Sequence, residues 1–158
     1  MYDAIKLESG NQTTQLIPNG AYKINSGLNG YVVRVPNGNL TTNAPVVEWP
    51  FQFLYDEQWR FTNLGNDVYS IISVNSGLAL AVQNSSTAVN GVLVQNPYTG
   101  ATNQQWHAVL NTSGGLSLVN QNSGLALDIP SQRSDYQNNV QLIQNTPNNC
   151  LLYTSRCV

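Results

Sequence analysis

The order of apolar and polar residues repeats itself along the chain. The clearest copy covers residues 73–106, where a Ser-Gly turn at Ser76 leads into the alternating apolar run LALAV at 78–82. A second apolar run follows at 92–94, and the copy closes on NQQW at 103–106. Runs in which every second residue is apolar, separated by turn residues, indicate short β-strands with one buried face.

Two further copies of this pattern flank the first. Upstream, YVVRV at 31–35 and VVEW at 46–49 lead to Glu57-Gln58-Trp59. Downstream, LALDI at 125–129 is followed by VQLI at 140–143. The tryptophans that end the first two copies, at positions 59 and 106, are 47 residues apart. A constant period of this length indicates a repeat architecture.

Each copy carries about four strand-like runs punctuated by Gly, Asn and Pro. The sequence therefore predicts an all-β fold of about twelve strands in a closed arrangement that leaves no free sheet edge. We place the repeats at about 18–67, 68–114 and 115–149, after an irregular lead-in at 1–17. Sustained helical periodicity is not found in the sequence.

Three repeats of this length, with SGLAL-type runs and closing Gln-Trp signatures, resemble the ricin-B-type β-trefoil lectins. These are carbohydrate-binding modules with a QxW repeat, and the resemblance covers residues 18–149. It implies a β-trefoil of three four-stranded repeats of about 47 residues. We expect Trp59 and Trp106 to occupy equivalent buried positions, and the Gln of the signature to bond with backbone groups of the neighbouring hairpin.

In this family a carboxylate follows the SGLAL run, an aromatic ring comes from a later strand or loop, and an Asn precedes the Gln-x-Trp. The ring covers the apolar face of a sugar, and the polar groups bond with its hydroxyls. Repeat one has Arg34 at the carboxylate position, repeat two has Ala81, and repeat three keeps Asp128. Ile143 and Gln144 stand near the aromatic position of repeat three, so a loop tyrosine is the expected ring there. The resemblance implies these carbohydrate-binding residues: Asp128, Tyr136, Gln141 and Asn149 in repeat three, Tyr98, Asn103 and Gln104 in repeat two, and Trp49 in repeat one.

Composition narrows the range of partners. Charged residues make up 9% of the chain and the formal net charge is −2, which argues against nucleic acid and anionic membranes. No apolar stretch approaches the ~20 residues needed for membrane insertion. A signal peptide is not visible after Met1, which leaves both secreted and cytoplasmic locations open.

The sequence predicts a non-catalytic module. Its few acidic residues form no repeat-matched acid and base pair, and neither metal-ligand spacing nor a phosphate loop is present. We expect neutral sugars or glycans as partners, no metal and no cofactor, and an upstream or partner domain stays open. Two alternatives also stay open: a trefoil that binds protein, such as a protease inhibitor, and a degenerate trefoil that has lost its ligand.

The last nine residues, 150–158 (CLLYTSRCV), break the pattern where a third Gln-x-Trp is expected after Asn149. Codons can be chosen for this segment that form an inverted repeat, and one half resembles the transposon end used to tag sequencing libraries. We therefore expect a non-native tail that contains both cysteines, Cys150 and Cys157. The last strand of the trefoil would then be missing or replaced, leaving the first strand without its closing neighbour and the core short of one large aromatic.

Overall fold

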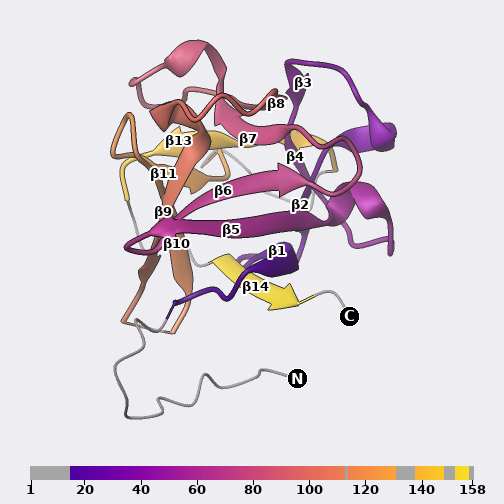
Figure 1. The fold of residues 1–158 in the computed structure, drawn as a ribbon. Helices are drawn as coiled ribbons and strands as arrows, with labels where there is room; N and C mark the ends of the chain where they lie inside the picture. The colour runs from indigo at the N-terminus through magenta and orange to yellow at the C-terminus, as the bar shows by residue number, and fades with distance from the viewer. Residues whose placement is uncertain (1–14, 113, 131–137, 148–151, 157–158) are drawn as a thin grey trace.

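The computed structural model describes residues 15–112, 114–130, 138–147 and 152–156, which form a β-trefoil of fourteen strands (Figure 1). Repeat one contains β1 (Gly20–Ser26), β2 (Val32–Arg34), β3 (Ala44–Pro45), β4 (Val47–Trp49) and β5 (Trp59–Gly65). Repeat two contains β6 (Val68–Ser73), β7 (Ala79–Val82), β8 (Leu93–Asn96) and β9 (Gln105–Leu110). Repeat three contains β10 (Leu116–Asn120), β11 (Ala126–Asp128), β12 (Val140–Gln141), β13 (Ile143–Asn145) and β14 (Leu152–Arg156). Short 3-10 turns occupy η1 (Pro36–Gly38), η2 (Tyr55–Glu57), η3 (Gln83–Ser85) and η4 (Thr102–Gln104).

The predicted all-β trefoil is confirmed, with twelve principal strands and two additional short ones, β3 and β12. These two strands pair with hairpin strands of a neighbouring repeat, β8 and β4 respectively. Within the described residues, no helix is both long and apolar enough to cross a bilayer.

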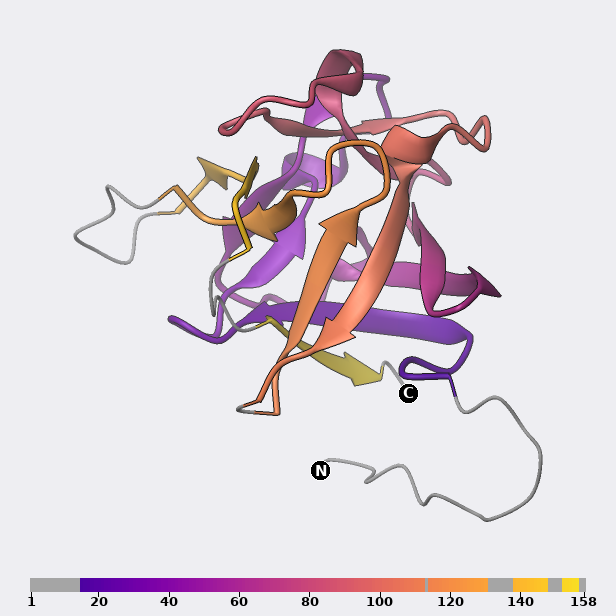
Figure 2. The ribbon, with the colours of Figure 1, turned by 90° about the vertical axis from the view of Figure 1, so that its left-hand side faces the viewer.

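Six strands close into a ring of antiparallel pairs in the order β1, β5, β6, β9, β10, β14 and back to β1. Figure 2 shows the long β9 and β10 hairpin of this barrel from the side. Since every strand in the ring has a neighbour on both sides, the barrel has no free edge.

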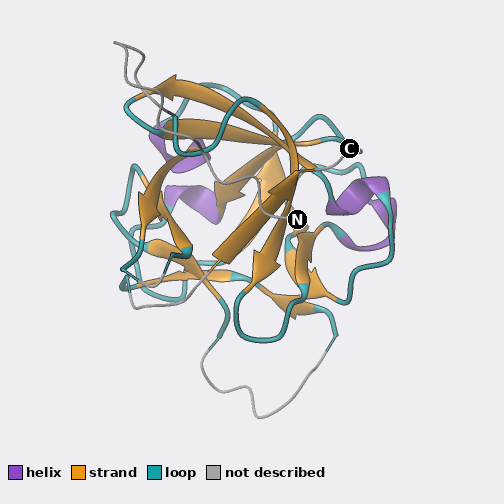
Figure 3. Cartoon of the chain, turned by 90° about the horizontal axis from the view of Figure 1, so that it is seen from below, coloured by secondary structure: helices purple, strands orange, loops and turns teal. Residues whose placement is uncertain are grey.

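The remaining strands form one hairpin per repeat: β2 with β4, β7 with β8, and β11 with β13. They lie at one end of the barrel. Figure 3 shows the molecule from the other end, where strands and loops make up almost all of the chain. The hairpins are joined to one another through β3, β12 and a bridge between Val92 and Ile143.

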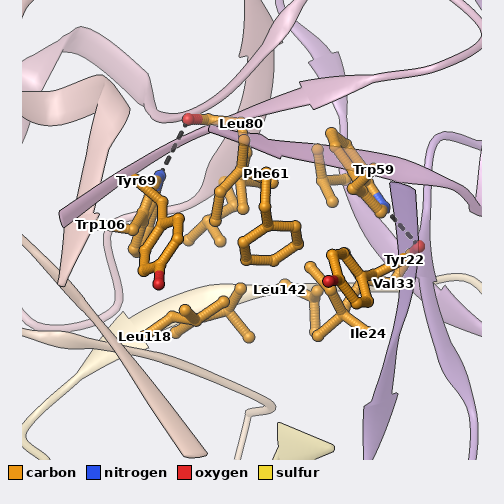
Figure 4. Close-up of a cluster of buried hydrophobic side chains, with 14 of the residues drawn as sticks. Tyr22, Ile24, Val33, Trp59, Phe61, Tyr69, Leu80, Trp106, Leu118 and Leu142 are labelled. Atoms are coloured by element: carbon orange, nitrogen blue, oxygen red, sulfur yellow. Dashed lines mark hydrogen bonds between the residues drawn. The ribbon is translucent and has the colours of Figure 1, made fainter. Parts of the chain in front are cut away.

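The core lies inside the barrel and under the hairpins. Trp59 and Trp106 are both 0% exposed, on either side of Phe61 (Figure 4). Their indole Nε1–H groups donate to equivalent hairpin carbonyls, those of Val33 at 2.8 Å and Leu80 at 3.0 Å. The prediction of equivalent buried positions is confirmed. Each indole therefore fills the core and also satisfies a buried carbonyl of its own repeat's hairpin.

The end of the predicted lead-in belongs to this core. Ile17 is buried, and its N–H donates to the Tyr69 hydroxyl at 2.9 Å. The N–H of Leu16 donates to Asp67 Oδ1 at 2.9 Å. Packing against the barrel thus begins before residue 18, and residues 1–14 lie outside the described residues.

The closing strand of the barrel is β14. It pairs with β1 from Tyr22 opposite Arg156 to Ser26 opposite Leu152, and with β10 at Leu116. The expectation that the first strand lacks a closing neighbour is therefore wrong. The last strand is replaced rather than missing, because backbone pairing in a ladder depends little on side-chain identity.

The register places Leu152 where the other repeats have tryptophan. Leu152 lies opposite Leu116 on one side and Ser26 on the other. Trp59 and Trp106 occupy the corresponding positions between their own neighbouring strands. The backbone of Leu152 thus occupies the point of the barrel that is equivalent to Trp59 and Trp106, while Cys150 and Cys157 lie outside the described residues.

Two buried glutamines connect successive repeats. Gln95 on β8 and Gln144 on β13 occupy equivalent hairpin positions, and each side-chain Nε2 donates to two backbone carbonyls of the preceding repeat. The acceptors are Asn39 and Thr41 for Gln95, at 2.8 and 3.0 Å, and Ser86 and Ala88 for Gln144, both at 2.9 Å. Each Oε1 also accepts from a serine of its own repeat. We call these two residues the glutamine clamps.

Candidate functional site

Each hairpin presents one position at the end of its first strand and one on its second strand that together define the candidate site. The registers Val32 to Trp49, Ala79 to Asn96 and Ala126 to Asn145 establish the equivalence. The two positions, which are not ladder partners, are Arg34 and Trp49 in repeat one, Ala81 and Asn96 in repeat two, and Asp128 and Asn145 in repeat three.

Repeat three holds a carboxylate and an amide in direct contact. Asp128 is 5% exposed, and its Oδ2 accepts from the Asn145 Nδ2 at 3.0 Å. The Asp128 Oδ1 accepts from the N–H of Ile129 at 2.8 Å. These bonds fix the orientation of the carboxylate, which is the preorganisation that a polar binding site requires.

The residue at the aromatic position of repeat three differs from the sequence-based expectation. Ile143 and Gln144 were expected near the aromatic position, but Ile143 is buried and Gln144 is a glutamine clamp. Asn145 stands at the position of Trp49 instead. Asn145 is identified as the equivalent of Trp49 by the strand register and not by counting residues along the sequence.

Of the other predicted residues of repeat three, only Gln141 is described, and it bonds elsewhere. Gln141 lies on β12, and its Nε2 donates to the Leu93 carbonyl of repeat two at 3.3 Å. Tyr136 and Asn149 lie outside the described residues, so their place in the site stays a prediction.

The hairpin of repeat two has no carboxylate, but the amides of Asn96 and Asn103 and the ring of Tyr98 lie on it or near it in the chain. Tyr98 is 41% exposed and lies two residues beyond Asn96, which occupies the aromatic position. Asn103 directs its Nδ2 to the Val82 carbonyl at 3.0 Å, at the end of β7. The tyrosine ring is therefore available to solvent, and the Asn103 amide is tied to the strand end.

Gln104, also predicted to bind sugar, braces its own loop. Its Oε1 accepts from the backbone N–H of Thr99 at 2.8 Å, and its Nε2 donates to the Pro97 carbonyl at 2.7 Å. Glu57 has the same role in repeat one, where its carboxylate accepts from the N–H groups of Gln52 and Leu54 at 2.8 and 3.0 Å. This position bonds to backbone in both repeats, but to its own loop and not to the neighbouring hairpin that was expected.

Repeat one contains a buried ion pair instead of a single carboxylate. Arg34 Nη2 lies 2.6 Å from Asp56 Oδ2, and Nη1 donates to Gln52 Oε1 at 2.7 Å. Glu57 Oε1 is 3.7 Å from Nη1, so one guanidinium faces two carboxylates. The sequence placed Arg34 at the carboxylate position but did not indicate this ion pair, because Asp56 is 22 residues away in the chain.

Trp49 lies beside the ion pair. The centre of its ring is 5.6 Å from the Arg34 guanidinium carbon, within the range of a cation–π contact. The ring is half-buried and its position is set by β4. Repeat one thus offers an aromatic ring next to a buried cluster of one guanidinium and two carboxylates. In the part of the chain that the structure describes, no group of three His, Cys, Asp or Glu side chains could hold a metal ion.

Comparison with known proteins supports the fold. The family described as "Ricin-type beta-trefoil lectin domain-like" matches residues 55–145. The designed threefold-symmetric protein ThreeFoil is similar at 29% identity and a TM-score of 0.83, covering 87% of this chain and 99% of ThreeFoil. Comparison with curated proteins gave no match.

Natural structures share the fold at lower identity. The Macrolepiota procera ricin B-like lectin, solved with lactose, is 18% identical with a TM-score of 0.75, covering 91% of this chain and 100% of the lectin. An exo-β-1,3-galactanase from Clostridium thermocellum is 22% identical with a TM-score of 0.80, covering 91% of this chain and 31% of the enzyme.

Proposed function

Because the chain belongs to the ricin-type β-trefoil lectin family, we propose that it is a non-catalytic carbohydrate-binding module for neutral glycans, with repeat three as its main site. The observation that carries this proposal is the contact between Asp128 and Asn145. A carboxylate accepts hydrogen bonds from adjacent sugar hydroxyls, while an amide both donates and accepts.

The proposed contact set of repeat three extends beyond these two residues. Tyr136 would supply the ring that covers the apolar face of the sugar, and Asn149 and Gln141 would supply further amides. A carboxylate at the centre of the site favours a neutral sugar, since an anionic ligand would meet a like charge. The lactose-bound relative supports a ligand of this class.

The pairing of Asp128 with an amide also supports binding without catalysis. Glycoside hydrolysis in most enzymes requires two carboxyl groups on either side of the scissile bond. The side chain bonded to Asp128 is Asn145, which cannot act as a general acid or base. Repeat two, with Tyr98 and Asn103, and repeat one, with Trp49, are proposed as weaker sites because neither has a carboxylate at the Asp128 position.

Titration with galactose and xylose tests the proposal. We expect dissociation constants in the millimolar range, about −4 kcal/mol. Asp128→Asn keeps the shape and the bond from Ile129 and should weaken binding by about tenfold, since hydrogen bonds to charged groups contribute about 1.5–3 kcal/mol. Tyr98→Ala is the matched variant for repeat two and should leave the repeat-three affinity unchanged.

Unchanged binding in Asp128→Asn would remove Asp128 from the repeat-three site, and unchanged repeat-two binding in Tyr98→Ala would remove Tyr98 from the repeat-two site. A glycan array combined with a protease panel separates the alternatives. Protease inhibition without glycan binding would establish the protein-binding trefoil. The absence of both glycan binding and protease inhibition would establish the degenerate trefoil that has lost its ligand.

A further inference from the structure

A loop of repeat one exposes several large apolar side chains. Residues 50–54 connect β4 to η2, which begins at Tyr55, and Phe53 and Tyr55 are 85% and 71% exposed. Leu54 between them is also exposed. Single exposed apolar residues are ordinary, but a contiguous aromatic group of this kind marks a binding surface.

Phe53 adopts a backbone conformation that disfavours its own side chain. Its φ is +64°, in the left-handed region, where a bulky residue is uncommon and strained. The equivalent residue of repeat two is Gly100, with φ +81°. The turn therefore has the glycine conformation in both repeats, and repeat one carries a phenylalanine there without burying it.

The loop holds these rings in place. The Glu57 carboxylate accepts from the backbone N–H groups of Gln52 and Leu54, on either side of Phe53. The Phe51 and Phe53 rings lie 4.3 Å apart, centre to centre. Lys23 Nζ lies 3.7 Å from the centre of the Phe51 ring. Phe51 is thus held between a cation and the exposed ring, so Phe53 has a fixed support.

The loop is also joined to the candidate site of repeat one. Gln52, between the two phenylalanines, accepts from Arg34 Nη1 at 2.7 Å. Trp49 precedes Phe51 by two residues. The loop and Trp49 are therefore both linked to Arg34, the loop through Gln52 and Trp49 through its ring.

We infer that Phe53, supported by Phe51, and Tyr55 form a separate stacking subsite for a further ring of an oligosaccharide chain. The inference rests on the proposed glycan-binding function and assigns this loop a role beyond the hairpin sites. Rigid aromatic rings suit the flat C–H faces of successive sugar rings. The net charge of −2 and the carboxylates of Asp56 and Glu57 behind the loop do not suit an anionic membrane.

Repeat two supplies the matched variants. Phe53→Gly and Tyr55→Thr introduce the residues found at the equivalent positions, Gly100 and Thr102. Leu110→Ser is the control, since it removes an exposed apolar side chain of repeat two. Xylose and xylotetraose are the probes, measured by calorimetry, with thermal melts to verify folding.

We expect xylotetraose to bind about tenfold more tightly than xylose, which corresponds to about 1.4 kcal/mol. This preference should be lost in the Phe53→Gly and Tyr55→Thr double variant and kept in Leu110→Ser, while xylose affinity stays unchanged in both.

Xylose binding with the same xylotetraose preference in the double variant would overturn the subsite and leave the proposed function standing. A xylotetraose affinity equal to that of xylose in the unmodified protein would also overturn it. If the unmodified protein binds neither sugar and no glycan on the array, the proposed function itself is refuted. Self-association that disappears in Phe53→Gly would show that a second copy of the chain covers the loop and would overturn the sugar subsite.

Discussion

We expect the effects of substituting Arg34 and Asp56, the buried ion pair of repeat one, on stability to be strongly coupled. Repeat two has neutral residues at both positions and provides the replacements. Arg34 and Asp56 are 4% exposed, and their closest atoms are 2.6 Å apart. The equivalent residues of repeat two are Ala81 and Asn103, in the same hairpin geometry. The double variant Arg34→Ala with Asp56→Asn therefore replaces a charged pair by a neutral pair that this fold already accommodates.

The expected free energies follow from what each change leaves behind. Arg34→Ala leaves the Asp56 carboxylate buried with the N–H of Gly38 at 2.9 Å, which should cost about 4 kcal/mol of unfolding free energy. Asp56→Asn leaves Arg34 with Gln52 and with Glu57 at 3.7 Å, and should cost about 2 kcal/mol. The double variant should cost about 3 kcal/mol rather than their sum of about 6, because no unpaired charge of the pair stays buried.

Urea unfolding followed by tryptophan fluorescence measures all four proteins, since Trp59 and Trp106 are buried in the core. A loss of 3 kcal/mol shifts the midpoint by about 1–3 M at the urea dependence typical of small domains. Leu110→Ser, a substitution at an exposed position, serves as a control and should change the free energy of unfolding by no more than about 0.5 kcal/mol. Additive losses in the double variant would refute the argument that the two charges depend on each other.

Three further outcomes are expected. Trp106→Leu should destabilise the protein by about 3 kcal/mol in the same urea assay, because it removes core volume and the bond to the Leu80 carbonyl; a loss below 1 kcal/mol would contradict the packing argument. Phe53→Gly should raise the unfolding free energy by about 1 kcal/mol through relief of the left-handed strain, and a clear decrease in melting temperature would show that the ring supports the fold. Burial raises the pKa of Tyr69 from 10.0 to about 12, so the folded state keeps this proton where the unfolded chain has lost it. Stability should therefore fall as the pH rises from about 10 through about 12, and absorbance at 295 nm should show one tyrosine titrating late; the absence of such a tyrosine would refute the assignment.

The fold could be predicted from the sequence because its signals are periodic. The spacing of Trp59 and Trp106 and the alternating runs before them define the repeat, and both are determined by local pattern and burial. Closure by residues 152–156 could not be predicted in this way. The ladder between β1 and β14 is made by backbone groups, which the tail supplies without the repeat's side-chain signature.

The site could be predicted only in part. Asp128 was identified because it directly follows the alternating run, whereas its partner Asn145 depends on strand register across a long loop. The ion pair of Arg34 with Asp56 likewise joins residues that only the tertiary fold brings together. The left-handed conformation of Phe53 had no sequence signal at all, because a phenylalanine in a loop does not indicate a glycine-type turn.

The glutamine clamps determine how the molecule must fold. Gln95 satisfies carbonyls of the repeat before it, and Gln144 does the same one repeat later, so each hairpin becomes complete only when its successor is in place. A single repeat cut from the chain would expose these carbonyls together with the apolar side chains that pack against the other repeats. The smallest cooperative folding unit is therefore the whole trefoil, and hydrogen exchange should show the loops at residues 39–41 and 86–88 opening together with the hairpins that follow them rather than with their own.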